Sequence, residues 1–222
     1  MNKILALLTL LYSGIIFSQT SIDENITIKF PSKPKTLENV VKTDTLNQSI
    51  KTILKTYYLN SKEESYVTMR LKILTNEDTE PNLPKSQIEL IKNYKQFIAG
   101  QLKGFSQKGM NIKDSTQITF NNYLAYKLTF KEVNSEEENG QSLILYLDGI
   151  YYEFIYSKVA SYNQKNKEIF FKSIKINDSE NLKQFTEPYN YWNALFKILL
   201  GIIFIYLIRK YRKMEKKRNL IK

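Results

Sequence analysis

The chain contains no cysteine and no histidine among its 222 residues. Without cysteine it can form no disulfide, no thiolate nucleophile and no Cys-ligated zinc or iron–sulfur site. Without histidine it lacks the commonest general base and the commonest metal ligand, and every Ser-His-Asp arrangement is excluded. Its 7 glycines form no phosphate-binding loop. The familiar catalytic centres are therefore mostly excluded, and we expect no cofactor.

The chain is rich in aromatic residues, with 16 Tyr, 12 Phe and 1 Trp, and 42% of its residues are hydrophobic. This composition is typical of a folded protein rather than a disordered one. The length corresponds to one soluble domain with additional terminal segments.

The net charge of +11 is concentrated near the C-terminus. Residues 1–19 contribute +1, residues 20–190 contribute +2 and residues 191–222 contribute +8. A nucleic-acid-binding domain would carry its basic residues on a folded face. The distribution therefore predicts that nucleic acid is not a partner.

Residues 1–18 match a secretory signal peptide. Lys3 is followed by an almost unbroken apolar stretch from Ile4 to Phe17, and Ser18 supplies a small residue for cleavage. A helix of that length falls short of the hydrocarbon core of a bilayer, which argues against the alternative of an uncleaved anchor.

A second apolar segment, residues 191–208, is predicted to cross the membrane as a helix. Residues 198–208 carry no charge and show no polar face, which argues against a helix lying on the membrane surface. Aromatic residues at its start and basic residues at its end are typical of the two membrane interfaces. The residues expected to anchor the chain are Trp192, Lys197, Ile198, Ile208, Arg209 and Lys210.

Residues 209–222 form a basic tail with eight Lys or Arg against one Glu. The positive-inside rule places this tail in the cytoplasm, where it can also contact anionic lipid. Together with the signal peptide, it predicts a single-pass type I protein of the cytoplasmic (inner) membrane. Its main domain, residues 19–176, would be extracytoplasmic, in the periplasm of a Gram-negative bacterium, followed by a polar linker over residues 177–190.

The central domain is predicted to be rich in strands. Strands are expected over residues 26–30, 36–43, 49–59, 66–74, 116–120 and 123–131. In the fourth of these, Val67, Met69, Leu71 and Ile73 alternate with polar residues and are expected to point inward.

One long helix is predicted over residues 87–108. Ser86 and Glu89 form a capping box at its start. Its expected apolar face consists of Ile88, Ile91, Tyr94, Ile98, Leu102 and Phe105.

Asp148-Gly149 predicts a hairpin with a type I′ turn. The pairs 147/150, 145/152 and 143/154 would then share the core face of the sheet. The opposite face carries the apolar side chains of Ile144, Tyr146, Tyr151 and Ile155, so both faces of the sheet need to be covered. Residues 163–173 are a candidate for the segment that covers this second face.

The opening Ile26-Thr27-Ile28-Lys29-Phe30-Pro31-Ser32-Lys33-Pro34 resembles the first strand and turn of the PsbP-like superfamily. The order of strands, long helix, Asp-Gly hairpin and a last short helix ending Phe171-Lys172-Ser173-Ile174-Lys175 is similar too. This resemblance implies binding or assembly roles, mostly without catalysis, and no functional residue carries over. The expected fold is α+β: an antiparallel sheet with a long helix and a shorter C-terminal helix packed on it, plus one C-terminal transmembrane helix.

Three groups of residues are candidates for a metal-binding or catalytic site. Glu77, Asp78 and Glu80 could ligate Ca²⁺, but their spacing is not that of an EF-hand. The run of carboxylates at residues 136–138 lacks the apolar setting that acid–base catalysis needs. Lys85-Ser86 could form a Ser–Lys pair, but Ser86 is expected to cap the helix. No catalytic, cofactor-binding or metal-binding residue is therefore predicted.

The resulting hypothesis is a membrane-tethered, non-enzymatic binding or assembly domain. Its expected partners are the lipid bilayer and an unidentified protein or envelope component. The alternatives are an envelope hydrolase with a Ser–Lys or metal site, and a structural subunit of a membrane complex.

Overall fold

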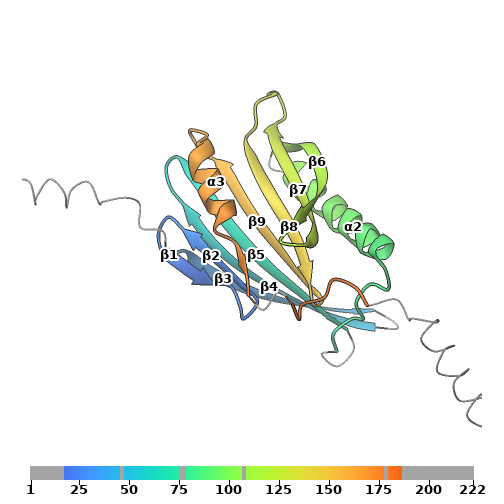
Figure 1. Ribbon diagram of the computed structural model, residues 1–222. Helices are drawn as coiled ribbons and strands as arrows, with labels where there is room; N and C mark the ends of the chain where they lie inside the picture. The colour runs from blue at the N-terminus through green and yellow to red at the C-terminus, as the bar shows by residue number, and fades with distance from the viewer. Residues whose placement is uncertain (1–17, 46–47, 76–78, 107–108, 178–179, 187–222) are drawn as a thin grey trace, which may run out of the picture. The chain divides into compact units, whose positions relative to one another are not determined.

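Alternating apolar and polar residues build a seven-stranded antiparallel sheet with strand order β3-β4-β5-β9-β8-β7-β6. The computed structural model (Figure 1) describes residues 18–45, 48–75, 79–106, 109–177 and 180–186. The strands of this sheet are β3 (Lys35–Thr45), β4 (Gln48–Asn60), β5 (Glu64–Thr75), β6 (Met110–Phe120), β7 (Tyr123–Glu132), β8 (Gly140–Leu147) and β9 (Ile150–Lys158). The predicted strands and the α+β, mainly antiparallel architecture are thereby confirmed.

One face of the large sheet is covered by a small sheet and a short helix (Figure 1). The small sheet has the order β1-β2-β10, and the helix is α3. Their bounds are β1 (Ser18–Ser21), β2 (Ile26–Phe30), β10 (Lys175–Ile176) and α3 (Gln164–Lys172). Phe30 of β2 and Phe170 of α3 are fully buried and their rings meet edge to face at 5.6 Å. We refer to this covered side as the β2/α3 face.

The other side of the sheet is covered in part by helix α2 (Gln87–Ser106), and we call it the α2 face. Leu90, Tyr94 and Ile98 of the helix are buried against Tyr126 and Ile144 of the sheet. Their four-residue spacing places them on one side of the helix. The sheet thus has a hydrophobic core on each face.

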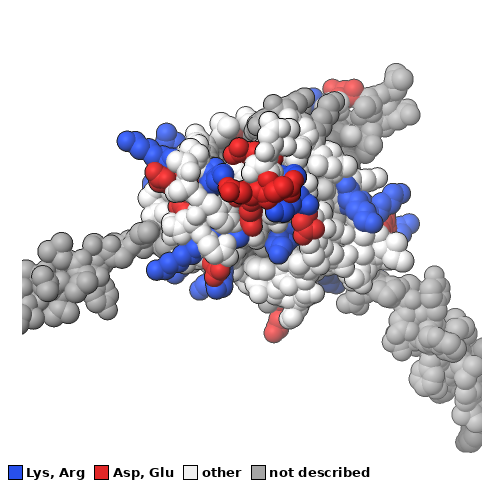
Figure 2. Space-filling view, turned by 90° about the horizontal axis from the view of Figure 1, so that it is seen from above, with Lys and Arg blue, Asp and Glu red and all other residues white. Residues whose placement is uncertain are grey.

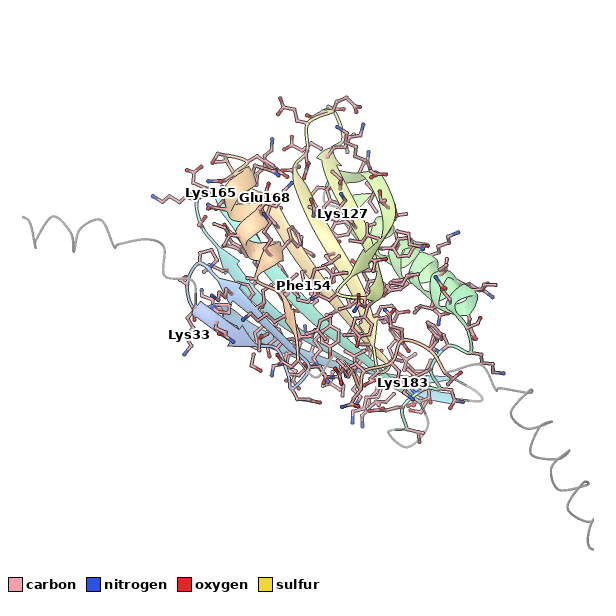
Figure 3. The ribbon with its side chains drawn as sticks, in the orientation of Figure 1. Lys33, Lys127, Phe154, Lys165, Glu168 and Lys183 are labelled. Atoms are coloured by element: carbon pink, nitrogen blue, oxygen red, sulfur yellow. The ribbon has the colours of Figure 1, made fainter. Side chains whose placement is uncertain are left out.

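On the face of the domain shown in Figure 2, charged residues of both signs lie at the surface. Figure 3 shows Phe154 in the middle of the fold, while Lys33, Lys165 and Glu168 lie at its periphery. Apolar side chains thus form the interior, and charged side chains lie outside it.

The predicted β8–β9 hairpin is confirmed. Asp148 and Gly149 both have positive φ, at 45° and 81°, as a type I′ turn requires. Leu147 pairs with Ile150, and the 145/152 and 143/154 pairs follow in the expected register. All six of these side chains are buried on the β2/α3 face.

The covers of this hairpin differ from the expectation. Residues 163–173 were expected to cover Ile144, Tyr146, Tyr151 and Ile155, but these side chains pack against α2. Helix α3 covers the six-residue face instead, because its buried Phe170 joins the strand residues Tyr66 and Phe154.

The apolar face of α2 is also rotated from the expected one. Ile88 is 81% exposed, and the fully buried residue of the first turn is Leu90. The first turn of the helix carries apolar residues on several sides, so periodicity alone did not identify the buried one.

The inward direction predicted for β5 is wrong as well. Tyr66 and Thr68 are buried beneath the β2/α3 layer, whereas Val67, Met69 and Leu71 on the α2 face are only half-buried. Helix α2 covers the β7 and β8 side of this face and leaves the β5 side more open.

Residues 180–186 pack against the domain and are not part of a free linker. Gln184 is buried, and Lys183 and Thr186 form backbone hydrogen bonds to Asp148 and Pro84. The predicted linker over residues 177–190 is therefore wrong for this stretch, because its polar side chains bond to the domain.

No helix among the described residues is long and apolar enough to cross a membrane. Residues 1–17 of the predicted signal peptide, the predicted membrane helix with its anchor residues, and the basic tail all lie outside the described residues. Ser18, the last residue of that predicted peptide, is the first residue of β1.

Candidate functional site

A pocket of about 400 Å³ opens on the α2 face where the helix leaves β5 uncovered. Its volume lies within the usual range of small-molecule sites. The apolar side chains that line it are Val67, Met69, Phe105, Met110 and Ile155. They come from β5, α2, β6 and β9, so the pocket exists only once the helix has docked on the sheet.

Gly104 of α2 also lines the pocket. A Cβ atom at this position would meet no other atom within 4 Å. The position is exposed, so a larger side chain can be added there without a clash at its Cβ. Gly100, one helical turn earlier, has equally open surroundings but does not line the pocket.

Three polar side chains border this apolar space: Thr56 of β4, Gln101 of α2 and Ser157 of β9. The Gln101 amide donates a 2.7 Å hydrogen bond to Oε2 of Glu153, which lies deeper on β9. Gln101 thus connects the wall of the pocket to a carboxyl group in the centre of the sheet.

Glu153 is only 1% exposed, and its Oε1 has no hydrogen-bond partner among the described residues. Burial raises the pKa of this carboxyl from 4.5 to about 7, and the nearby Ser142 hydroxyl lowers it in part. The Ser142 hydroxyl is itself buried and has no hydrogen-bond partner among those residues. The site therefore combines an apolar pocket with an adjacent protonatable group.

The second buried carboxylate, Glu64, has a different environment on the β2/α3 face. It accepts hydrogen bonds from the hydroxyls of Tyr66 and Tyr156, at 2.6 and 2.8 Å, and from the Asn166 amide. Burial and the Glu64 carboxylate together raise the pKa of both tyrosines. With its oxygens satisfied, Glu64 holds α3 on the sheet and is not available to a ligand.

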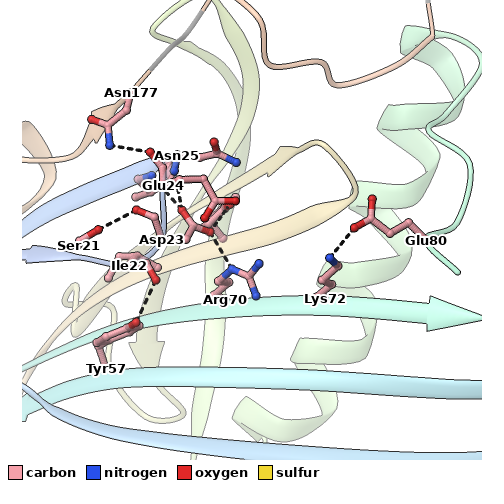
Figure 4. Close-up of polar contacts among 12 residues, drawn as sticks. Ser21, Ile22, Asp23, Glu24, Asn25, Tyr57, Arg70, Lys72, Glu80 and Asn177 are labelled. Carbon is pink, nitrogen blue, oxygen red and sulfur yellow. Dashed lines mark hydrogen bonds and ion pairs between the residues drawn. The ribbon is translucent and has the colours of Figure 1, made fainter. Parts of the chain in front are cut away.

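Asp23 forms a third polar cluster, shown in Figure 4. Its carboxylate accepts from Arg70 Nε at 2.7 Å, from the Tyr152 hydroxyl at 2.6 Å and from the backbone N–H groups of Asn25 and Ile26. This cluster ties the turn before β2 to β5 and β9. Its contacts also fit a structural role.

The acidic run at residues 136–138 pairs with lysines. Glu136 pairs with Lys131, Glu137 lies 3.9 Å from Lys158, and Glu138 lies 3.0 Å from Lys167. The Tyr162 hydroxyl also donates to Glu138. These contacts hold the β7–β8 loop against its neighbours.

The remaining candidate residues from the sequence are the acidic group at residues 77–80 and Ser86. Glu80 pairs with Lys72 (Figure 4), and Glu77 and Asp78 lie outside the described residues. Within the described part of the chain, no group of three or more acidic side chains could hold a metal ion. The Ser86 hydroxyl accepts from the Glu89 backbone N–H at 3.3 Å, which confirms it as a helix cap.

Sequence reasoning missed both Glu153 and Gln101. The available signal was one carboxylate inside the apolar run from Ile150 to Tyr156, on a strand whose two faces both need cover. No sequence pattern showed that Gln101, rather than a nearby lysine of α2, would lie above it.

No family model and no curated protein matches the chain. The solution structure of cyanobacterial PsbP (CyanoP) from Synechocystis sp. PCC 6803 is similar, with a TM-score of 0.44 and 10% sequence identity. The match covers 75% of this chain and 96% of that one. The resemblance to PsbP noted in the sequence is thus confirmed as a weak one, and no functional argument rests on it.

Proposed function

We propose that the protein is a membrane-tethered, extracytoplasmic binding domain without catalytic activity. Its membrane helix, residues 191–208, would hold the domain at the outer side of the cytoplasmic membrane. The pocket between α2 and β5 would bind an apolar group of an envelope component. The single observation that carries the binding role is this pocket of about 400 Å³, lined mainly by apolar side chains.

The surroundings of the pocket support binding rather than catalysis. Its polar side chains are two hydroxyls and one amide, from Thr56, Ser157 and Gln101. An apolar pocket with a few polar groups that orient the ligand is typical of binding sites. Glu153 lies behind Gln101 and not in the lining, so its proton would affect the pocket indirectly.

Methionine methyl NMR on the full chain tests the pocket directly. The chain has 4 methionines, and Met69 and Met110 line the pocket. We expect n-decanol, used as an apolar probe, to shift the methyl signals of these two residues. The full chain would be studied in lipid nanodiscs, and the signals assigned with Met→Leu variants.

A pair of glycine variants provides the matched control. Gly104→Leu adds a bulky side chain to the lining of the pocket and is expected to abolish the decanol-induced shifts. Gly100→Leu adds the same side chain to the same helix outside the pocket and should leave them intact. Equal responses of the two variants, or no shift in the unmodified chain, would refute a binding pocket at this place.

The proposed topology is tested with single cysteines, because the natural chain has none. Val159→Cys lies on the domain at a 59% exposed position, and Asn219→Cys lies in the basic tail. In spheroplasts we expect a membrane-impermeant maleimide to label position 159 at once and position 219 only after permeabilisation. The reverse pattern would overturn the topology while leaving the pocket result unaffected.

A further inference from the structure

Strand β3 is an edge of the seven-stranded sheet and pairs only with β4 among the described strands. It is 11 residues long, and every side chain from Lys35 to Asp44 is exposed. Leu37, Val40 and Val41 are each more than half exposed. A long edge strand with unpaired backbone groups and apolar side chains is a template for pairing with another strand.

We propose that β3 pairs with β3 of a second copy of this chain, antiparallel, about a two-fold axis that passes at Val40. The two seven-stranded sheets then continue into one. The proposal goes beyond the pocket and does not depend on it, because β3 contributes no residue to the pocket lining.

Symmetry limits the possible registers. In a continuous sheet, paired residues must point to the same face, and successive residues of a strand alternate between faces. A two-fold axis perpendicular to the sheet therefore passes at a residue, not between two residues. The register centred on Val40 pairs all of Lys35–Thr45, because Val40 is the middle residue of the strand.

The charges of β3 favour the same register. With the axis at Val40, Glu38 lies opposite the partner's Lys42, and symmetry repeats this pair. A shift of the axis to Val41 would place Glu38 opposite the partner's Asp44. A shift to Asn39 would leave Glu38 opposite the partner's Val40. Opposite charges directly across two strands stabilise their pairing, and like charges oppose it.

Apolar side chains are covered by the same arrangement. Val40 would contact the partner's Val40 on one face of the joined sheet. Leu37 and Val41 would lie beside the partner's Thr43 and Asn39 on the other face. Pairs of β-branched residues are favourable across strands, so the exposed Val40 gains an apolar partner.

Disulfide cross-linking of the full chain in detergent micelles tests the register. Val40→Cys introduces a single cysteine on the proposed axis, where two Cα atoms lie about 4.5–5.5 Å apart. That separation permits a disulfide. Under mild oxidation we expect at least about tenfold more disulfide dimer than from Val159→Cys, an exposed valine elsewhere on the domain.

Val41→Cys is the register control, because the proposed axis places residue 41 opposite Asn39 and not opposite itself. We expect this variant to cross-link less than Val40→Cys. If Val40→Cys forms no more dimer than Val159→Cys, or if Val41→Cys exceeds it, the proposed pairing is wrong. Association through the predicted membrane helix would not depend on which strand position carries the cysteine.

Charge exchange provides an independent test by sedimentation of the full chain in detergent. Glu38→Lys and Lys42→Glu each create two like-charge pairs and should weaken the dimer about tenfold or more. A mixture of these two variants restores both pairs in a heterodimer, as does the double variant E38K/K42E in a homodimer. No loss in the single variants, or no recovery in the mixture, would overturn the proposal; unchanged near-UV circular dichroism would confirm that each variant is folded.

Discussion

The side-chain amide of Gln101 donates to the buried carboxyl group of Glu153 at 2.7 Å, and this contact joins α2 to the centre of the sheet. Glu153 has a pKa raised to about 7 because burial disfavours its charged form. One of its two oxygens has no partner among the described residues. Its protonation state is therefore expected to affect folding stability near neutral pH.

The stability of the domain is expected to fall as pH rises from about 4.5 to about 7. Over this window folded Glu153 keeps its proton while the unfolded chain loses it, so ionisation favours unfolding. The full fall is about 3 kcal/mol at most and ends above pH 7. Glu153→Gln removes this group and should flatten the curve, measured by urea unfolding followed through tyrosine near-UV circular dichroism.

Glu136→Gln is the control for that experiment. The exposed Glu136 has its pKa lowered by Lys131, so its contribution is lost only below about pH 4.5, outside the window. This variant should therefore keep the fall of the unmodified chain. If Glu153→Gln and the unmodified chain show the same slope between pH 5 and 7, the assignment of the fall to Glu153 is wrong.

Asp23→Ala is expected to lower the free energy of unfolding by about 2–4 kcal/mol. The substitution leaves Arg70 Nε, the Tyr152 hydroxyl and two backbone N–H groups without their acceptor. The Asp23 side chain is only 8% exposed, so water cannot readily replace it. Glu80→Ala breaks the neighbouring pair with Lys72, but Glu80 is exposed. Its cost should stay within about 0.5 kcal/mol in the same urea experiment, and comparable losses would contradict the structural role of Asp23.

The same substitution is expected to have opposite effects at two glycines. Gly149→Ala should destabilise the domain by about 1–2 kcal/mol, because φ of +81° in the β8–β9 turn disfavours any Cβ. Gly100→Ala lies in α2 with open space around it and should stabilise the domain by up to about 1 kcal/mol. Thermal unfolding distinguishes the signs, and a stabilising Gly149→Ala would exclude the type I′ turn.

Local chemistry explains which parts of the fold could be predicted from the sequence. The β8–β9 hairpin was predicted residue for residue because Asp148-Gly149 determines both turn and register. The helix that covers each face of this hairpin was not predicted correctly. Phe170 of α3 and Leu90 of α2 contact strands that are distant in the sequence, and these contacts decide which helix packs on which face. The pocket was missed for the same reason, because its lining combines residues from α2, β4, β5, β6 and β9.

The contacts of residues 180–186 likewise could not be predicted from the polar composition of this segment. Gln184 was assigned to a linker because its neighbourhood is polar, yet its side chain is buried against β7 and β8. Its amide donates to the carbonyl groups of Leu124 and Tyr146, at 2.7 and 2.9 Å, and its oxygen accepts from the Leu124 N–H at 2.8 Å. Polar composition does not reveal which backbone groups a side chain will satisfy.

Gln184→Ala should therefore lower the free energy of unfolding by about 1–3 kcal/mol, because it leaves backbone groups of Leu124 and Tyr146 buried without partners. Lys183→Ala is the matched control, since Lys183 contacts Asp148 only through its backbone N–H and C=O in the bonds described. Urea unfolding of both variants should show a loss at position 184 and a change within about 0.5 kcal/mol at position 183. Equal, small effects would mean that residues 180–186 are a linker after all.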